Sequence, residues 1–204
     1  MISTTKDELT LHPEMAGILM TPEEFDAAEV DPDDGSRYEL VHGVLVVTPI
    51  PSEAEAGPNE LLGHLLLAYQ EYHRQGRALD ATLPERYIRT ADGRRKADRV
   101  IWAGLGRTPD PRIDAPTIAV EFVSSGRRNW QRDYVEKRRE YLAAGVREYW
   151  IIDRFRRTLT VYGRRISRSG ARAVAENEIY TTKLLPGFEL PLARLLAAAD
   201  AWKK

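Results

Sequence analysis

The sequence has no cysteine among its 204 residues, and its 30 basic residues include only 6 lysines. The absence of cysteine excludes structural disulfides and thiolate zinc sites. It also fits a reducing compartment, so we expect a cytoplasmic protein. The scarcity of lysine makes the role of each internal lysine a separate question.

Long apolar runs are also missing. No run approaches the roughly 18 residues that a membrane-spanning helix needs, and the first 20 residues lack the basic and apolar stretches of a secretory signal. We therefore expect no membrane partner. The length fits one hydrophobic core, so we expect a single domain over residues 21–204. Residues 1–20 show no sustained hydrophobic period, which predicts a flexible N-terminal arm.

Acidic and basic residues are segregated along the chain, although the formal net charge is only −1. Residues 1–60 carry 14 acidic and 2 basic side chains, whereas residues 86–172 carry 22 basic and 10 acidic ones. The basic segment could face a nucleic-acid backbone. Two alternatives stay open: these charges scatter over a solvated surface, or the acidic segment docks a partner or masks the basic one.

Four segments carry helix signals. Thr21-Pro22-Glu23-Glu24 is a capping box with proline at the first helical position, so a short helix is predicted from there to about Glu29. Leucines at helical spacing predict a second helix over residues 59–74. Further helices are expected over residues 130–144, ended by Gly145, and over residues 192–202.

The strand signals lie between these helices. A His42-Gly43 turn predicts a β-hairpin of residues 37–41 and 44–48. Other strands are expected over residues 86–89, 97–102, 117–123, 148–153, 158–162 and 179–184. This order predicts an α/β fold with a central mixed β-sheet flanked by helices.

Glu121 is an acid inside a strand that is otherwise apolar on both faces, Thr117 to Val123. A buried, unpaired carboxylate would cost several kcal/mol, so it needs a cation, hydrogen-bond donors or a raised pKa. It could also lie at the end of the strand or pair with a nearby arginine. Asp98 begins a second apolar strand 23 residues earlier. Two carboxylates on neighbouring strands suit Mg²⁺, because Mg²⁺ takes one or two carboxylates and keeps several waters.

Lys137 lies on the helix that follows the Glu121 strand. Asp133, Lys137 and Tyr141 form a row at positions i, i+4 and i+8, so Lys137 can project toward the preceding strand. A lysine there could orient a water and offset charge on a transferring phosphoryl group. The alternative is an ordinary ion pair of Asp133 with Lys137.

The pattern of these segments resembles the Uma-type restriction endonucleases, a branch of the PD-(D/E)XK nuclease superfamily. The resemblance covers residues 21–190 and is most specific from Glu121 to Asp153. The segments that carry it are Tyr38–Gly43, Pro49–Ser52, Asp98–Val100, Pro116–Ser125, Asp133 with Lys137 and Tyr141, and Gly145–Asp153.

The resemblance implies a restriction-endonuclease-like fold in which Asp98 and Glu121 bind Mg²⁺ or Mn²⁺, with Glu39 as a further acidic member of the site. The superfamily's lysine usually stands two residues after the glutamate, where this chain has Val123. Lys137 is therefore the candidate for that role. The chain also has Ala97 where the family has proline, and it lacks a histidine that often follows the Pro-Ser segment.

Three arginines near the start of the helix, Arg127, Arg128 and Arg132, are candidates for contacts with nucleic-acid phosphates. The four histidines show no metal-ligand spacing. The leading hypothesis is a metal-dependent endonuclease that hydrolyses phosphodiester bonds, with DNA as the favoured substrate. The alternative is an inactive nucleic-acid-binding or assembly module with the same fold. A homodimer is compatible with the sequence but is not required by it.

Overall fold

The computed structural model describes residues 9–31, 33–163 and 170–202. It divides into two compact units: one contains the described residues up to Ile50 and Thr90–Lys96, and the other contains Pro51–Arg89 and the described residues from Ala97 onward. We describe each unit by itself. In the described part of the chain, no helix is both long enough and apolar enough to cross a membrane.

The first unit is built around the predicted hairpin of β3 (Ser36–Val41) and β4 (Val44–Pro49). His42 and Gly43 form the turn with φ values of 50° and 76°, as a two-residue hairpin with positive φ at both turn positions requires. Leu40 of β3 also pairs with Arg94, the first residue of β6 (Arg94–Ala103). The hairpin prediction is therefore confirmed.

The N-terminal part of the first unit contains α1 (Pro22–Ala27), which has the predicted capping box of Thr21 and Glu24. A 3-10 helix, η1 (Pro13–Met15), precedes it. The strand β1 (Thr10–Leu11) pairs in parallel with β2 (Glu29–Val30), and Leu11 is completely buried. Residues 1–8 of the expected arm lie outside the described residues. Residues 9–20 are mostly exposed, but backbone hydrogen bonds join them to the hairpin, such as that from the Met20 N–H to the Gly43 carbonyl at 2.8 Å.

The second unit contains a sheet in the order β10-β9-β8-β7-β6, with β5 (Leu79–Arg89) also paired to β6. The strands β7 and β8 run parallel, whereas the pairs β6/β7, β8/β9 and β9/β10 are antiparallel. The predicted mixed sheet is therefore confirmed. The bounds of the remaining strands are Ile118–Phe122 for β7, Glu148–Asp153 for β8, Thr158–Tyr162 for β9 and Ala171–Ala175 for β10.

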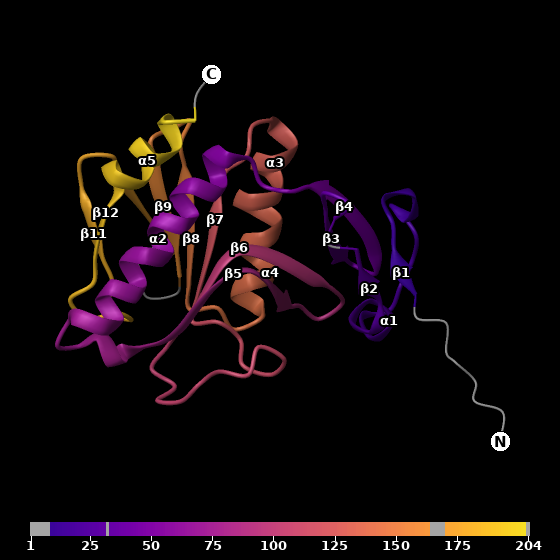
Figure 1. Cartoon of the computed structure of the whole chain (residues 1–204), viewed down its shortest axis with the longest axis horizontal. Coiled ribbons are helices and arrows are strands. Elements are labelled where there is room, and N and C mark those ends of the chain that lie inside the picture. The colour runs from indigo at the N-terminus through magenta and orange to yellow at the C-terminus, as the bar shows by residue number, and fades with distance from the viewer. Residues whose placement is uncertain (1–8, 32, 164–169, 203–204) are drawn as a thin grey trace. The chain divides into compact units, whose positions relative to one another are not determined.

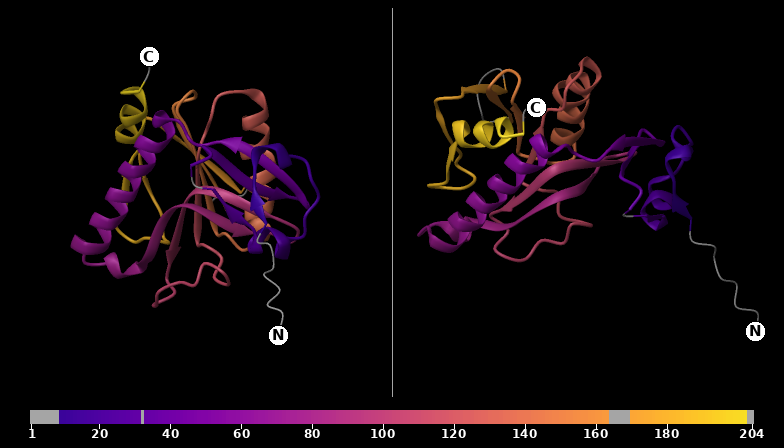
Figure 2. Two further views of the ribbon diagram at one scale, coloured as in Figure 1. Left: turned by 45° about the vertical axis from the view of Figure 1, so that its right-hand side comes forward. Right: turned by 45° about the horizontal axis from the view of Figure 1, so that its top comes forward.

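Helices cover both faces of this sheet (Figures 1 and 2). On one face, α2 (Glu53–Tyr72) and α5 (Leu192–Asp200) pack on Val120 and Trp150. On the other lies one continuous helical segment, composed of α3 (Arg127–Gln131), η3 (Arg132–Lys137) and α4 (Arg138–Ala143). Its Tyr134 and Tyr141 pack with Ala119, Tyr149 and Ile151. A short 3-10 helix, η2 (Gly76–Ala78), and a two-stranded sheet of β11 (Ile179–Thr181) and β12 (Glu189–Pro191) complete the unit.

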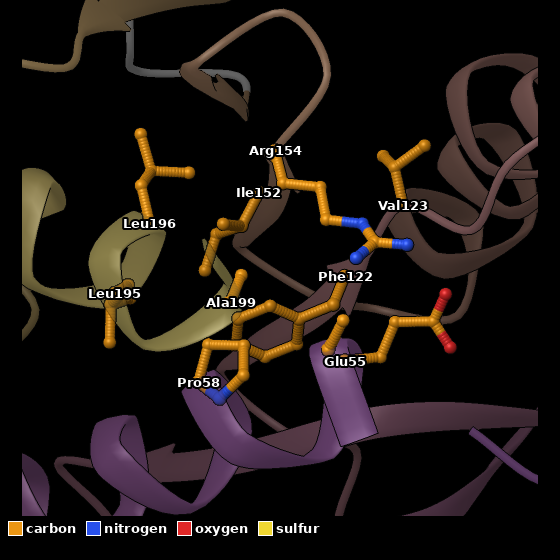
Figure 3. Close-up of a pocket in the computed structure, with 10 residues that line it drawn as sticks. Glu55, Pro58, Phe122, Val123, Ile152, Arg154, Leu195, Leu196 and Ala199 are labelled. Atoms are coloured by element: carbon orange, nitrogen blue, oxygen red, sulfur yellow. The ribbon is translucent and has the colours of Figure 1, made fainter. Parts of the chain in front are cut away.

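The face covered by α2 and α5 is mainly apolar. Figure 3 shows Pro58, Phe122, Leu195 and Leu196 gathered where the two helices meet the strands. The cavity among them measures only about 10 Å³, which is close to the minimum for one water. This cavity is therefore too small for a small-molecule ligand.

Several elements differ from the sequence-based expectation. The helix α2 begins at Glu53, six residues earlier than predicted, because Ser52 and Glu55 form a capping box and Pro58 is accommodated inside the helix. The strands β10 and β12 fall in segments that show no strand pattern in the sequence. The segment η3 is a π-helix rather than a continuous α-helix.

A buried arginine fixes α2 against β6. The Nε of Arg99 donates to Asn59 Oδ1 at 2.7 Å and its Nη2 donates to the Asn59 carbonyl at 3.0 Å. The Nδ2 of Asn59 donates in turn to the carbonyl of Asp98 at 2.8 Å. A Cβ on Gly63 would lie 2.6 Å from Nη2 of Arg99, so only glycine leaves room for the guanidinium here.

We predict that Gly63→Ala destabilises the protein by about 1–3 kcal/mol, because the new methyl group must displace the buried guanidinium. Chemical denaturation measures this loss. The matched control is His64→Ala on the exposed side of the same helix, which should not lower the free energy of unfolding. Equal stability of the two variants would contradict the assigned contact.

Candidate active site

Asp98 and Glu121 lie on adjacent strands of the second unit. The register of β6 and β7 pairs Arg99 with Val120 and Val100 with Ala119; continued by one pair, it sets Asp98 opposite Glu121. Residues directly opposite in antiparallel strands project from the same face, with Cβ atoms about 5 Å apart. Both side chains are buried, with exposures of 5% and 2%. The structure thus brings together the two predicted metal ligands.

The carboxylate of Asp98 is held by the backbone of β7. Its Oδ2 accepts a hydrogen bond from the Phe122 N–H at 2.7 Å. Because the Asp98 carbonyl also accepts from Asn59 of α2, both ends of this residue are fixed. The carboxylate is therefore oriented by the sheet itself, without the help of a mobile loop.

The carboxylate of Glu121 is held by the helical segment that follows it. The Nζ of Lys137 lies 3.0 Å from Glu121 Oε1, and the hydroxyl of Tyr141 donates to the same oxygen at 2.9 Å. Lys137 is itself only 2% exposed. Charge-assisted hydrogen bonds between buried partners are the strong class, so this lysine is directed at the glutamate as the helical row predicts.

The π-helical segment η3 presents a third carboxylate, Asp133, which is completely buried. Its Oδ1 accepts from the Nε of Arg132 at 2.9 Å. Its Oδ2 has no hydrogen-bond partner among the described residues. Burial raises the pKa of this carboxyl, and the positive charges of Lys137 and Arg132 oppose the rise. Single π-turns within α-helices are frequently found at functional sites.

Tyr149 of β8 has a hydroxyl whose pKa is affected by the carboxylates around it. Its hydroxyl donates to the Asp133 carbonyl at 3.0 Å. The pKa of Tyr149 is raised well above its usual value, first by burial and then by the charges of Glu121, Asp133 and Asp98. The carboxylates of Glu121, Asp133 and Asp98 thus act on one buried hydroxyl, and the charge of Arg132 opposes them.

Glu39, the further acidic residue expected at the site, belongs to the first unit. It is 4% exposed. Its Oε1 accepts from the Lys96 N–H at 2.6 Å and its Oε2 lies 3.5 Å from Nη1 of Arg95. These contacts hold the start of β6 against β3. Participation of Glu39 in the site stays a prediction.

The three arginines expected at phosphates differ in their surroundings. Arg127 and Arg128 are exposed at the start of α3. Arg132 is paired with Asp133, and its side chain is 23% exposed. Arg127 and Arg128 are thus open to a ligand, whereas Arg132 already has a structural partner.

Sequence reasoning missed two features of the site. Tyr141 was part of the helical row, but its hydrogen bond to Glu121 was not foreseen; its i+4 spacing from Lys137 was the available signal. The complete burial of Asp133 had no signal at all. Among the described residues, no group of three or more acidic, histidine or cysteine side chains is arranged to hold a metal ion.

Comparison with known proteins identifies the family. The family model Uma2, described as "Putative restriction endonuclease", matches residues 22–193. The chain belongs to the Uma2 family. Its fold is also found in the crystal structure of a "putative nuclease belonging to DUF820" from Anabaena variabilis, with a TM-score of 0.65 and 13% identity over 88% of this chain and 99% of that one. No curated protein matches the chain significantly.

Membership of the Uma2 family confirms the resemblance seen in the sequence, and the solved structure confirms the fold class. Together they support a nuclease, and hence a nucleic-acid substrate. The shared fold alone does not assign the residues above, because one fold can carry different functions.

We predict that Asp133 makes stability depend on pH. The pKa of Asp133 in the folded protein lies above the unfolded value of 3.8. Its contribution to the free energy of unfolding is therefore fully present below pH 3.8 and is lost as pH rises through the folded pKa. Asp133→Asn should remove a slope of up to about 1.4 kcal/mol per pH unit. Urea denaturation between pH 4 and 8 tests this; a wild-type minus variant difference that is constant with pH would contradict it.

Proposed function

We propose that this chain is a magnesium-dependent endonuclease that hydrolyses phosphodiester bonds in DNA, with Asp98 and Glu121 as metal ligands and Lys137 as the residue that positions the attacking water. The observation that carries the proposal is the buried lysine 3.0 Å from a buried glutamate that lies opposite a buried aspartate. The family description supports DNA as the substrate.

The donor set fits the metal. Mg²⁺ is hard, prefers oxygen and takes one or two carboxylates beside waters and substrate phosphate, and Asp98 and Glu121 supply two on one face. The unpaired Oδ2 of Asp133 is a further oxygen without a partner in the described chain. When bound, the cation would supply Lewis-acid polarisation of the phosphate and compensate its negative charge.

The residues of the chain have distinct tasks in this proposal. Tyr141 and Lys137 both donate to Oε1 of Glu121, which fixes the rotation of the carboxylate. Lys137 has three N–H donors, so it can contact Glu121 and a water at the same time. Because its ammonium group is buried, its charge acts on the developing phosphoryl charge with little screening.

The exposed Arg127 and Arg128 are proposed to contact substrate phosphates beyond the scissile one. Their location directly after β7 places them close in sequence to Glu121. A homodimer and a cytoplasmic location stay predictions.

We expect Glu121→Gln to abolish Mg²⁺-dependent cleavage of plasmid DNA, because the amide keeps the size of the side chain but removes its charge. The control is Glu148→Gln, the same change on the neighbouring strand, where the carboxylate accepts hydrogen bonds from Trp150, Tyr180 and Thr182. Cleavage should survive in the control at temperatures where it stays folded. Undiminished cleavage by Glu121→Gln would remove Glu121 from the mechanism.

Lys137→Met is expected to lower kcat by about 10²–10³, the usual loss when one electrostatic contact to a transition state is removed. Mn²⁺ binding by calorimetry should persist, since the carboxylates remain. Arg139→Met, an exposed position on the same helix, is the matched control and should retain its kcat. A Lys137→Met enzyme with wild-type kcat would leave the lysine with a structural role only.

An inactive nucleic-acid-binding module is the second candidate function. The observation that favours it is the pairing of Glu121 with Lys137 and Tyr141, which already compensates the carboxylate without a metal. Calorimetry with Mn²⁺ separates the two functions. Absence of Mn²⁺ binding by the wild type, together with salt-sensitive DNA association, would favour the binding module.

A further inference from the structure

A groove opens where the strands β7 and β8 end. It has a volume of about 500 Å³ and is lined by the loop after β7, the start of α3 and the turn after β8. This is within the range of small-molecule sites. The chemistry proposed for Asp98 and Glu121 does not use it.

Aromatic rings and arginines surround this groove. Trp130 stacks on Tyr134 with ring centroids 5.1 Å apart and an interplanar angle of 18°. The guanidinium of Arg156 lies over both rings, at 5.4 and 5.5 Å. Phe155, which is 55% exposed, lies under the guanidinium of Arg154 at 4.7 Å. Flat rings alternating with cations are the composition of surfaces that stack nucleobases.

The carboxylate of Asp153 holds the aromatic stack and the turn after β8 in place. The hydroxyl of Tyr134 donates to Oδ2 of Asp153 at 3.0 Å. The other oxygen of Asp153 accepts from the backbone N–H groups of Phe155 and Arg156, both at 2.9 Å. One carboxylate therefore fixes both the aromatic stack and the turn that carries the exposed side chains.

The exposed cations of the groove favour an anionic strand, because its one lining carboxylate, Asp153, is buried and already accepts hydrogen bonds from Tyr134, Phe155 and Arg156. Arg127 and Arg156 are exposed at its edge, and Ser124 and Ser125 offer hydroxyl groups. The groove thus combines a flat apolar surface for a base with cations for its phosphates.

We propose that this groove binds an unpaired nucleobase of a nucleic-acid strand, stacked against Trp130 and Phe155, with Arg127 and Arg156 at the flanking phosphates. The assignment rests on the proposed nuclease function and names its substrate form as single-stranded or locally opened nucleic acid. Val123 of the groove lies two residues after Glu121, or about 7 Å along an extended chain. One wall of the groove therefore begins two residues from the proposed metal ligand Glu121.

Fluorescence anisotropy in EDTA, where no metal-dependent cleavage occurs, measures the binding of a labelled 12-nucleotide single strand, a 12-base-pair duplex and a mononucleotide. Phe155→Ala should weaken single-strand binding about tenfold, the loss that one stacked base produces, and should leave the weaker duplex binding unchanged. Because Phe155 is exposed, this variant should stay folded. The control is Trp202→Phe, which changes an exposed aromatic residue outside the groove and should leave single-strand affinity unchanged.

A second measurement does not depend on Phe155. In the Trp202→Phe background, the single strand should quench the fluorescence of Trp130, since Trp102 and Trp150 are buried. Trp130→Phe should abolish the quenching but keep most of the affinity. Equal single-strand affinity of wild type and Phe155→Ala, no quenching, or tighter binding of the duplex would each overturn the groove assignment.

The two proposals fail separately. Single-strand binding and quenching in a wild type that never cleaves DNA would overturn the proposed nuclease function and support the groove. Cleavage that depends on Glu121, together with single-strand binding that does not change in the Phe155 and Trp130 variants, would support the nuclease function and overturn the groove assignment.

Discussion

The buried carboxylate of Glu121 on β7 is the constraint on which the arrangement of the second unit depends. A carboxylate that is 2% exposed cannot persist there unpaired. The compensation comes from the next helical segment, through Lys137 and Tyr141. Since both donors must reach one oxygen, the rotation and height of that helix over the sheet are set by Glu121, and the apolar contacts of Tyr134 and Tyr141 follow from the same placement.

The two faces of the sheet show two solutions to burying a glutamate. Glu148 lies on the face covered by α2 and α5 and accepts only from neutral donors, on Trp150, Tyr180 and Thr182. Such a site is satisfied and has no reason to admit a cation. On the opposite face Glu121 has a lysine, an aspartate opposite it in the register, and a second buried aspartate with an unpaired oxygen. That surplus of charge is costly for stability, and cost of this kind is typical of functional sites.

Local signals in the sequence predicted most of the helices and strands of this fold. The His42-Gly43 turn and the Thr21 capping box involve neighbouring residues, and the strands 148–153 and 158–162 are bounded by polar turns. The strand β10 was missed because only Val174 of it is fully buried, which leaves no alternation to detect. The start of α2 was missed because Pro58 is a helix breaker in most contexts. The π-turn and the unpaired Oδ2 of Asp133 depend on backbone hydrogen bonding and burial, which no spacing of side chains encodes.

The absence of lysine at position 123 connects the site with the groove. Residues two apart on a strand share a face, so a lysine at that position would lie on the side of Glu121. Lys137 brings its ammonium to that side from the helix instead. Position 123 therefore need not carry a positive charge. Val123 at this position is buried and lines the groove beside the aromatic stack. Moving one cation from strand to helix thus leaves the end of β7 free to form a surface on which a base can stack.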